Sequence, residues 1–273
     1  MNTSSQTLAF IGGGNMAGAI LGGLIAAGLS PQSLLVVEPL EAQRERLAAV
    51  HGVRTLAAAD ATLDEAALIV WAVKPQFFRE AAAPCAPHVA GALHLSVMAG
   101  IRSDAIARAT GTGRVVRAMP NTPALIGRGI AGLYARAAVT RDDRALVEQV
   151  LAPTGQTLWV ERETDLDAVT ALSGSGPAYV FYFVEAMIEA AQAMGLAPEQ
   201  GRALALATFA GATELAARSS ESLGVLRERV TSKGGTTHAA LVSLESHRVQ
   251  AAFIEALQAA RRRAEELGEE FGP

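Results

Sequence analysis

The chain is poor in cysteine and in charge, and it has no surplus of basic residues. Its 273 residues include one cysteine, Cys85, which excludes a disulfide framework and a cysteine-rich zinc site. Lysine and arginine total 23 against 27 acidic residues, so nothing favours a nucleic-acid partner. The five histidines form no metal-ligand pattern, and no G-x-S-x-G elbow is present. We therefore expect a cytoplasmic protein without metal or acyl-transfer chemistry.

Charge is missing altogether from Leu8 to Val37, a run longer than the ~20 residues that cross a bilayer. This run is nevertheless a poor membrane helix, because Gly12-Gly13-Gly14 interrupts it near the start and Ser30-Pro31 near the end. The cationic region of a secretory signal is also missing. With half of its residues apolar, the chain has enough material for a large hydrophobic core. We expect a globular protein of one or two domains with no membrane span.

The same run has the pattern of a βαβ unit. An apolar strand over residues 7–11 leads into Gly12-x-Gly14-x-x-Ala17, a helical stretch follows to Ala27, and a second strand covers residues 34–37. In such a unit the first glycine allows a tight turn, the second lets the backbone approach a pyrophosphate, and the small third residue permits close helix packing. The spacing predicts a dinucleotide site at the helix N-terminus, in preference to a purely structural glycine turn.

Glu38 ends the second strand of this unit. An acid at this position binds a ribose diol and repels a 2′-phosphate, which favours NADH over NADPH. Arg44 and Arg46 follow closely and could offset that effect, and Glu38 could instead serve the helix that begins near Glu41. The choice of cofactor stays open at this point.

The remaining sequence divides into two parts. Strand-like runs at 68–73, 93–97 and 115–118 alternate with helical stretches to about residue 160, so we expect an α/β, Rossmann-type doubly wound sheet over residues 1–162. Residues 163–273 have helical patterns alone, and we expect an all-α domain there, with one helix starting at Ser175-Gly176-Pro177 and Ser175 as its N-cap.

Two helices of this second part, ending near Met194 and spanning 198–218, are apolar nearly all round. Helices of that kind are buried on every side. We expect a homodimer in which a partner covers them, although the first domain could do so instead.

The polar segments at the predicted strand ends are candidate ligand loops, because ligands of open α/β sheets bind there. They are Lys74-Pro75-Gln76, Met98–Ile101 and Met119–Pro123. In the helical part, Gly234 and Gly235 present bare backbone before a helix that we expect to start near His238. Such a turn binds a carboxylate or simply caps the helix, and the spacing alone favours neither.

Five motifs together resemble pyrroline-5-carboxylate reductases over essentially the whole chain. They are Gly-Gly-Gly-Asn-Met-Ala at 12–17, Ala-Val-Lys-Pro at 72–75, Met-Pro-Asn-Thr-Pro at 119–123, Ser-Gly-Ser-Gly-Pro-Ala at 173–178 and Thr-Ser-Lys-Gly-Gly-Thr-Thr at 231–237. The resemblance implies reduction of the C=N bond of 1-pyrroline-5-carboxylate to L-proline by NADPH or NADH. It also implies a homodimer, or a higher homo-oligomer such as a decamer.

The resemblance also assigns roles to residues. It places the cofactor against Gly12, Gly14, Asn15, Met16, Ala17, Glu38, Ala72, Val73, Lys74, Pro75, Ala99, Gly100 and Asn121, with Asn121 near the nicotinamide. It places the substrate against Ser232, Lys233, Gly234, Gly235, Thr236 and Thr237. The backbone of 234–236 would hold the substrate carboxylate, and the Thr237 hydroxyl would bind the ring nitrogen as the catalytic group.

Two positions depart from the family pattern. Lys233 stands where many members have proline, and Ala58-Ala59-Asp60 stands where an asparagine often meets the adenosine ribose. These departures, with Glu38, leave the family's frequent preference for NADPH open.

A β-hydroxyacid dehydrogenase is the nearest alternative enzyme. That family needs a catalytic lysine on a helix of the second domain, whereas the two lysines here are Lys74, after a strand, and Lys233, in the glycine turn. A dinucleotide-binding scaffold without turnover is an alternative from another class, which the retained Gly-Gly-Thr-Thr turn disfavours.

Overall fold

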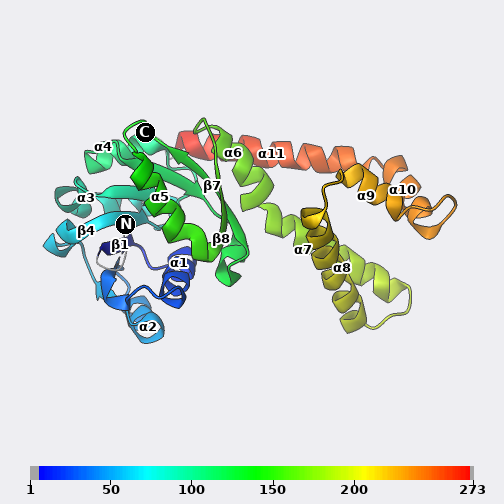
Figure 1. Cartoon of the computed structure of the whole chain (residues 1–273), viewed down its shortest axis with the longest axis horizontal. Coiled ribbons are helices and arrows are strands. Elements are labelled where there is room, and N and C mark those ends of the chain that lie inside the picture. Colours follow the sequence, from blue (N-terminus) through cyan, green and yellow to red (C-terminus); the bar gives the residue numbers. More distant parts are fainter. Residues whose placement is uncertain (1–5, 271–273) are drawn as a thin grey trace. The chain divides into compact units, whose positions relative to one another are not determined.

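The computed structural model describes residues 6–270, which form two compact units (Figure 1). The first unit comprises the chain up to Ser175 together with the residues from Ala260 onward, and the second comprises Gly176–Ala259. The division at residue 175 comes later than the predicted boundary at 162, because the helices that follow the last strand still pack on the sheet. Gly132 of that sheet leaves room for Val169, since a Cβ there would lie 2.7 Å from the valine Cγ1. The predicted boundary at 162/163, between the Rossmann-type domain and the all-α domain, stays a prediction.

The first unit is built on an eight-stranded sheet in the order β3-β2-β1-β4-β5-β6-β7-β8. Its strands are β1 (Thr7–Ile11), β2 (Leu34–Val37), β3 (Arg54–Leu56), β4 (Ala66–Trp71), β5 (Leu93–Ser96), β6 (Val115–Met119), β7 (Gly129–Ala135) and β8 (Gly155–Trp159). Neighbouring strands are parallel except β6 and β7, which pair antiparallel. Strands β1, β2 and β4 are apolar runs buried on both faces, as central parallel strands must be.

Helices cover both faces of this sheet. They are α1 (Asn15–Ala26), α2 (Glu41–His51), α3 (Phe78–Val89), α4 (Ser103–Thr110), α5 (Arg141–Leu151) and α6 (Asp165–Val169). Short 3₁₀ turns lie at η2 (Pro31–Ser33), η3 (Ala61–Glu65), η4 (Pro75–Phe77), η5 (Thr122–Ile126) and η6 (Ala152–Thr154). One core cluster joins the sheet to α1, α2 and α5, and the other joins it to α3 and α4. The doubly wound α/β architecture predicted from the sequence is confirmed.

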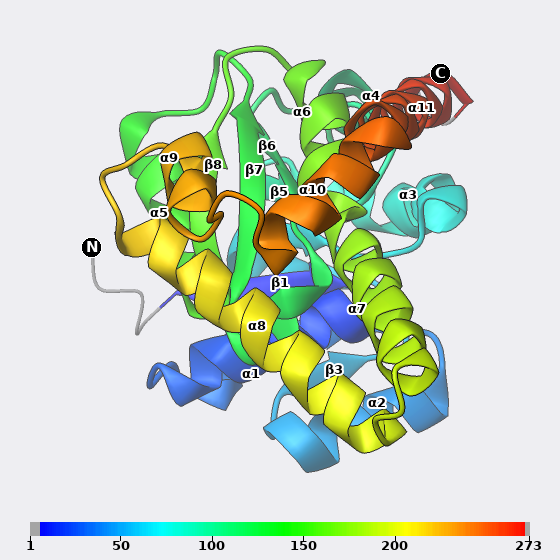
Figure 2. The same ribbon diagram turned by 90° about the vertical axis from the view of Figure 1, so that its right-hand side faces the viewer.

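The second unit consists of helices α7 (Gly176–Ala193), α8 (Pro198–Arg218), α9 (Leu223–Arg229), α10 (Thr236–Ser246) and the first part of α11 (Val249–Glu270). Helices α7 and α8 pack as an antiparallel pair (Figure 2). They approach closely at Gly201, where a Cβ would lie 2.8 Å from the Cβ of Ala191. Phe253 of α11 packs edge-on against Tyr179 and Phe183 of α7. The all-helical second part is thus also confirmed.

Three local predictions need correction. The predicted strand at 68–73 ends at Trp71: the Ala72 N–H still donates to the Ile11 carbonyl, but the chain then leaves the sheet for the 3₁₀ turn that starts at Pro75. Ser175 is not an N-cap with extended backbone: it has helical dihedrals and continues a π-helix, η7 (Thr170–Gly174), into α7. The helix predicted near His238 begins two residues earlier, at Thr236.

The uncharged stretch of the sequence is the β1–α1–β2 unit. Leu8, Phe10, Ile20 and Leu34 are fully buried in it. Among the helices described between residues 6 and 270, none combines the length and the apolar character needed to cross a membrane.

Candidate active site

The predicted cofactor residues come together at one edge of the sheet. Strands β1, β2, β4, β5 and β6 are mutually parallel, so their carboxyl ends share this edge. Between β1 and β4 the chain order reverses, and this switch point is where doubly wound sheets bind dinucleotides. The loops that follow these strands carry the Gly12-x-Gly14-x-x-Ala17 motif, called the fingerprint loop below, and also Glu38, residues 72–75, residues 98–100 and Asn121. The sequence-predicted cofactor positions therefore lie along one edge of the sheet in the first unit, and their role in binding a cofactor stays a prediction.

The fingerprint loop has the geometry that its residue types predict. Gly12 has φ +95°, a conformation that favours glycine, and a Cβ there would lie 2.9 Å from the backbone of Ala72. A Cβ on Gly14 would meet open space, so the backbone is accessible at the start of α1. Ala17 is fully buried against the sheet. The first turn of α1 has no acidic residue, and Gly14, its N-cap, offers no side-chain cap. The free N–H groups of this helix end thus fit a pyrophosphate.

Glu38 holds the fingerprint loop from the end of β2. Its Oε2 accepts a hydrogen bond from the Gly13 N–H at 2.9 Å, and its Oε1 accepts one from the Leu40 N–H at 3.0 Å. Leu40 is the N-cap of α2, so the carboxylate also serves that helix. Glu38 is buried, with 8% of its surface exposed. The two interpretations of Glu38 are therefore compatible: the carboxylate lies beside the loop and also supports the start of α2.

Gln43 of α2 acts on the same loop, although no sequence motif had indicated it, and Arg44 of α2 acts on the connection that precedes the helix. Gln43 donates through Nε2 to the Gly13 carbonyl at 2.5 Å, so side chains bind both polar groups of this glycine. Arg44 donates through Nη1 to the carbonyls of Glu38 and Pro39, at 2.9 and 2.8 Å. Arg44 thus stabilises the β2–α2 connection.

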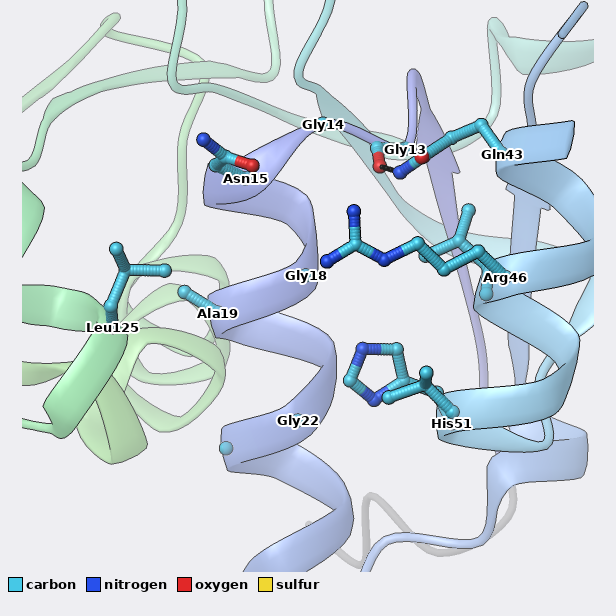
Figure 3. Close-up of a pocket in the computed structure, with 13 residues that line it drawn as sticks. Gly13, Gly14, Asn15, Gly18, Ala19, Gly22, Gln43, Arg46, His51 and Leu125 are labelled. Atoms are coloured by element: carbon cyan, nitrogen blue, oxygen red, sulfur yellow. Dashed lines mark hydrogen bonds between the residues drawn. The ribbon is translucent and has the colours of Figure 1, made fainter.

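A groove of about 330 Å³ extends from the fingerprint loop between α1 and α2 (Figure 3). Gly14, Gly18 and Gly22 form its α1 wall, and Arg46 and His51 line the α2 side. A Cβ on Gly22 would lie 3.3 Å from the His51 ring. Gly22 thus leaves room for the His51 ring of α2, whereas a Cβ on Gly14 would meet open space.

The loops after β4 and β5 form the next part of the site. Ala72 continues the β1 pairing, since its N–H donates to the Ile11 carbonyl at 2.9 Å. Val73 and Pro75 are half-buried, whereas Lys74 is exposed. Gly100 has φ +76° at the turn between β5 and α4. The residues from 72 to 75 and the 98–100 turn are thus available as walls of a cofactor site.

A buried charged network supports the end of the 98–100 turn. Glu163 accepts hydrogen bonds from the Ser103 N–H and hydroxyl, both at 2.6 Å, at the start of α4. The same carboxylate pairs with Arg117 of β6 at 2.8 Å. Burial lowers the pKa of the Arg117 guanidinium, and the Glu163 carboxylate opposes this effect. Arg102 forms a two-bond pair with the buried Asp167 at 3.2 and 3.0 Å. The network ties α4 and β6 to the segment before α7.

Asn121 lies at the end of β6, as predicted, and its amide is engaged within the protein. Oδ1 accepts from the Ile130 N–H at 3.0 Å, and Nδ2 donates to the Ser173 hydroxyl at 3.1 Å. The predicted contact with the nicotinamide stays a prediction.

The predicted substrate residues lie in the second unit, in the turn between α9 and α10 (Figure 2). Gly234 has φ +73°, and the Gly235 N–H donates to the Ser232 carbonyl at 3.0 Å. Thr236 and Thr237 are the first two residues of α10, and its N-cap, Gly235, provides no side-chain cap. The first N–H groups of α10 are therefore free of intrahelical acceptors. Ser232 and Lys233 are exposed.

Titratable side chains do not gather into a metal site in the part of the chain that the structure describes. Across the described residues, no group of three or more His, Cys, Asp and Glu side chains is placed to hold a metal ion. Cys85 of α3 is buried in the core, and this burial raises the pKa of its thiol to about 11.

Comparison with known families gives two matches. Residues 163–267 match the family model described as pyrroline-5-carboxylate reductase dimerisation. Residues 7–100 match the model described as NADP oxidoreductase coenzyme F420-dependent.

Individual relatives extend the likeness to the whole chain. A pyrroline-5-carboxylate reductase from Pseudomonas aeruginosa is 38% identical over 98% of this chain and 99% of its own length. The solved structure of a pyrroline-5-carboxylate reductase from Coxiella burnetii is 36% identical, with a TM-score of 0.89 over 96% of this chain and 98% of the other. A pyrroline carboxylate reductase from Plasmodium falciparum, solved with NADP bound, is 27% identical, with a TM-score of 0.87 over 97% and 99%. This chain belongs to the pyrroline-5-carboxylate reductase family.

Proposed function

We propose that this protein reduces the C=N bond of 1-pyrroline-5-carboxylate to give L-proline, with NADPH or NADH as reductant, as the last step of proline biosynthesis in the cytoplasm. The observation that carries the assignment of the substrate is the turn before α10. There Gly234 and Gly235 present bare backbone beside the free N–H groups of a helix N-terminus. Such a setting binds a carboxylate. The cyclic imine has one carboxylate, beside the ring nitrogen.

The substrate contacts follow from this turn. The backbone of Gly234, Gly235 and Thr236 holds the carboxylate, and exposed Ser232 and Lys233 flank it. Lys233 adds a positive charge on the same turn, which favours an anionic group. The Thr237 hydroxyl, one residue into α10, hydrogen-bonds the ring nitrogen and orients the imine.

The cofactor contacts belong to the first unit. Gly12, Gly14, Asn15, Met16 and Ala17 hold the pyrophosphate at the N-terminus of α1. Residues 72–75, Ala99 and Gly100 form the wall along which the nicotinamide half extends, and Asn121 closes it from β6. When bound, the cofactor supplies a hydride to the ring carbon of the protonated imine.

The residues of this chain then have one chemical task, which is to position the reactants. The protonated imine is already an electrophile, and the product keeps the proton on its secondary amine. Positioning and placement of charge supply the catalysis in a reaction of this kind.

The choice between the two reductants depends on Glu38. Its carboxylate lies at the end of β2, where the adenosine ribose of a dinucleotide is bound. A 2′-phosphate at that place would meet this negative charge, and Arg44, which binds the adjacent carbonyls, compensates only in part. We propose that Glu38 biases the protein towards NADH.

A homodimer is the assembly that we propose. Several large apolar side chains of α7 and α8 are exposed in the single chain, among them Phe181 at 60%, Tyr182 at 68% and Leu204 at 57%. Exposed aromatic and aliphatic side chains gathered on two packed helices fit a partner subunit. Light scattering at micromolar concentration measures the mass directly: a dimer supports the proposal, a monomer contradicts it, and a larger mass such as a decamer shows further assembly of dimers.

One assay tests the proposed reaction. Oxidation of NADH and of NADPH is followed in parallel, with 1-pyrroline-5-carboxylate and with a panel of keto acids as substrates. Turnover with the imine alone supports the assignment. Turnover with keto acids would favour a β-hydroxyacid dehydrogenase activity, and cofactor binding without any turnover would favour a scaffold.

A further inference from the structure

Asn121 joins three segments of the first unit that are distant in sequence. It follows β6, accepts a hydrogen bond from the Ile130 N–H of β7 at 3.0 Å, and donates one to the Ser173 hydroxyl at 3.1 Å. Both Asn121 and Ser173 are half-buried. Both ends of the amide are thus engaged within the protein.

The segment that carries Ser173 has an irregular backbone. Residues Thr170–Gly174 form a π-helix, in which the Ser175 N–H donates to the Thr170 carbonyl at 2.8 Å. A π-helical turn inserts one extra residue into a helix and is frequently found at functional sites. Here two successive residues meet the end of β6. Ser173 contacts Asn121, and a Cβ on Gly174 would lie 2.5 Å from the terminal carbon of Met119.

The hydrogen bond between Asn121 and Ser173 therefore holds the Met119–Pro123 turn. This turn closes the wall along which the nicotinamide half of the cofactor is proposed to extend. On one side the turn is fixed to β7 through Asn121, and on the other it packs against the π-helix through Met119 and Asn121. The turn has no regular strand neighbour beyond Met119, where the β6–β7 pairing ends. Without the Ser173 hydroxyl, the Nδ2 group of Asn121 loses its acceptor, and the Asn121 side chain keeps only its bond to the Ile130 N–H.

We infer that Asn121 and Ser173 form a positioning pair, in which Ser173 orients Asn121 and thereby the Met119–Pro123 turn for binding of the nicotinamide cofactor. This inference deepens the proposed function and rests on it for the identity of the cofactor. Ser173 acts through Asn121, so it is a positioning residue in this arrangement.

The test compares Ser173→Ala and Ser173→Thr with the unaltered protein. Each is titrated with NADH and NADPH alone, by the change in intrinsic fluorescence, and is then assayed with 1-pyrroline-5-carboxylate. For Ser173→Ala we expect the Kd and the KM to rise about tenfold for whichever of NADH and NADPH the unaltered protein binds more tightly. A tenfold change corresponds to the loss of one hydrogen bond. The KM of the imine should change less than about twofold, and Ser173→Thr, which keeps the hydroxyl, should restore the cofactor values.

Two controls separate positioning from general damage. Ser175→Ala removes a neighbouring hydroxyl of the same motif outside the pair, and should leave the cofactor Kd unchanged. A double-mutant cycle with Asn121→Ala should be strongly non-additive, because either single change breaks the same contact.

Several results would overturn the inference: a cofactor Kd unchanged in Ser173→Ala, equal rises in the KM of cofactor and imine, failure of Ser173→Thr to restore binding, or full additivity in the cycle. Because the titrations contain no imine, they test the pair even if the protein fails to reduce 1-pyrroline-5-carboxylate. Failure of the proposed reaction is thus distinguishable from failure of the pair.

Discussion

The indole N–H of Trp71 donates a hydrogen bond to Nδ1 of His94 at 3.0 Å, and both side chains are fully buried. Trp71 ends β4 and His94 lies on the neighbouring strand β5. Because Nδ1 accepts this bond, the proton of the neutral ring is on Nε2, which donates to the Val89 carbonyl at 3.1 Å. The core is therefore built around a neutral histidine.

This arrangement predicts that the protein loses stability in mild acid. Burial lowers the pKa of His94 to about 4 from an ordinary 6.5, although the bond to Val89 opposes this effect. Below pH 6.5 the unfolded chain takes up a proton that the folded protein refuses, so the free energy of unfolding falls as the pH falls from about 6.5 to about 4. The total loss attributable to His94 is about 3 kcal/mol.

Urea denaturation at fixed protein concentration, from pH 7.5 down to pH 4.5, measures this dependence. The variant His94→Gln should be less stable at pH 7.5 and should show a shallower loss in acid. His88→Gln removes a half-exposed histidine near the end of α3 and serves as the matched control. An equally steep loss in His94→Gln would mean that other groups cause the acid sensitivity.

Those parts of the fold that depend on local sequence patterns could be predicted. The β1–α1–β2 unit has an uncharged and largely apolar pattern, with glycine where φ is positive and where backbones approach closely. The bounds predicted for α8, Pro198 to Arg218, agree with the structure because proline at its start and the following polar segment mark its ends.

Features that depend on tertiary contact could not be predicted. Strand β3, Arg54–Leu56, is too short and too polar to show a strand pattern, and it forms because β2 offers an edge. The antiparallel pairing of β7 with β6 depends on the intervening turn. In the site, Gln43 binds Gly13 across 30 residues of sequence, and no spacing rule indicates that contact.

Removing the charge of Glu38 should shift the cofactor preference. The variant Glu38→Gln keeps an acceptor oxygen for the Gly13 N–H but no longer repels a 2′-phosphate. We expect the ratio of kcat/KM for NADPH to kcat/KM for NADH to rise about tenfold, because a partly screened repulsion between the carboxylate and the 2′-phosphate is lost. The shorter Glu38→Ser should shift the ratio in the same direction, with weaker binding of both cofactors because the Gly13 contact is lost.

Parallel kinetics with both reductants measure this ratio. Glu41→Gln, which neutralises an exposed acid in the first turn of α2, is the control and should leave it unchanged. If the ratio does not move in Glu38→Gln, the acid only supports the loop and the start of α2.

Loss of Glu163 should destabilise the first unit. Its carboxylate compensates the buried Arg117 guanidinium, whose Nε already has no hydrogen-bond partner among residues 6–270. Glu163→Ala leaves that charge unpaired and frees the Ser103 N–H, so we expect the free energy of unfolding to fall by about 3 kcal/mol. Glu163→Gln keeps an acceptor and should cost about half as much. Urea denaturation checks both, with exposed Glu161→Ala as the control. Equal stability of Glu163→Ala and Glu161→Ala would show that the network contributes nothing.

The Thr237 hydroxyl is the group that we expect to act directly on the substrate. It lies on the second residue of α10, half-buried, beside the glycine backbone proposed to hold the carboxylate. Thr237→Ala should reduce kcat/KM for 1-pyrroline-5-carboxylate by roughly 10–100-fold, if the hydroxyl contributes one hydrogen bond that strengthens in the transition state. Thr237→Ser keeps the hydroxyl and should retain most of the activity. Cofactor Kd values should be the same in both variants, because the turn lies outside the cofactor residues. Steady-state kinetics with the imine varied at saturating cofactor separate these effects, and unchanged kinetics in Thr237→Ala would remove this residue from the mechanism.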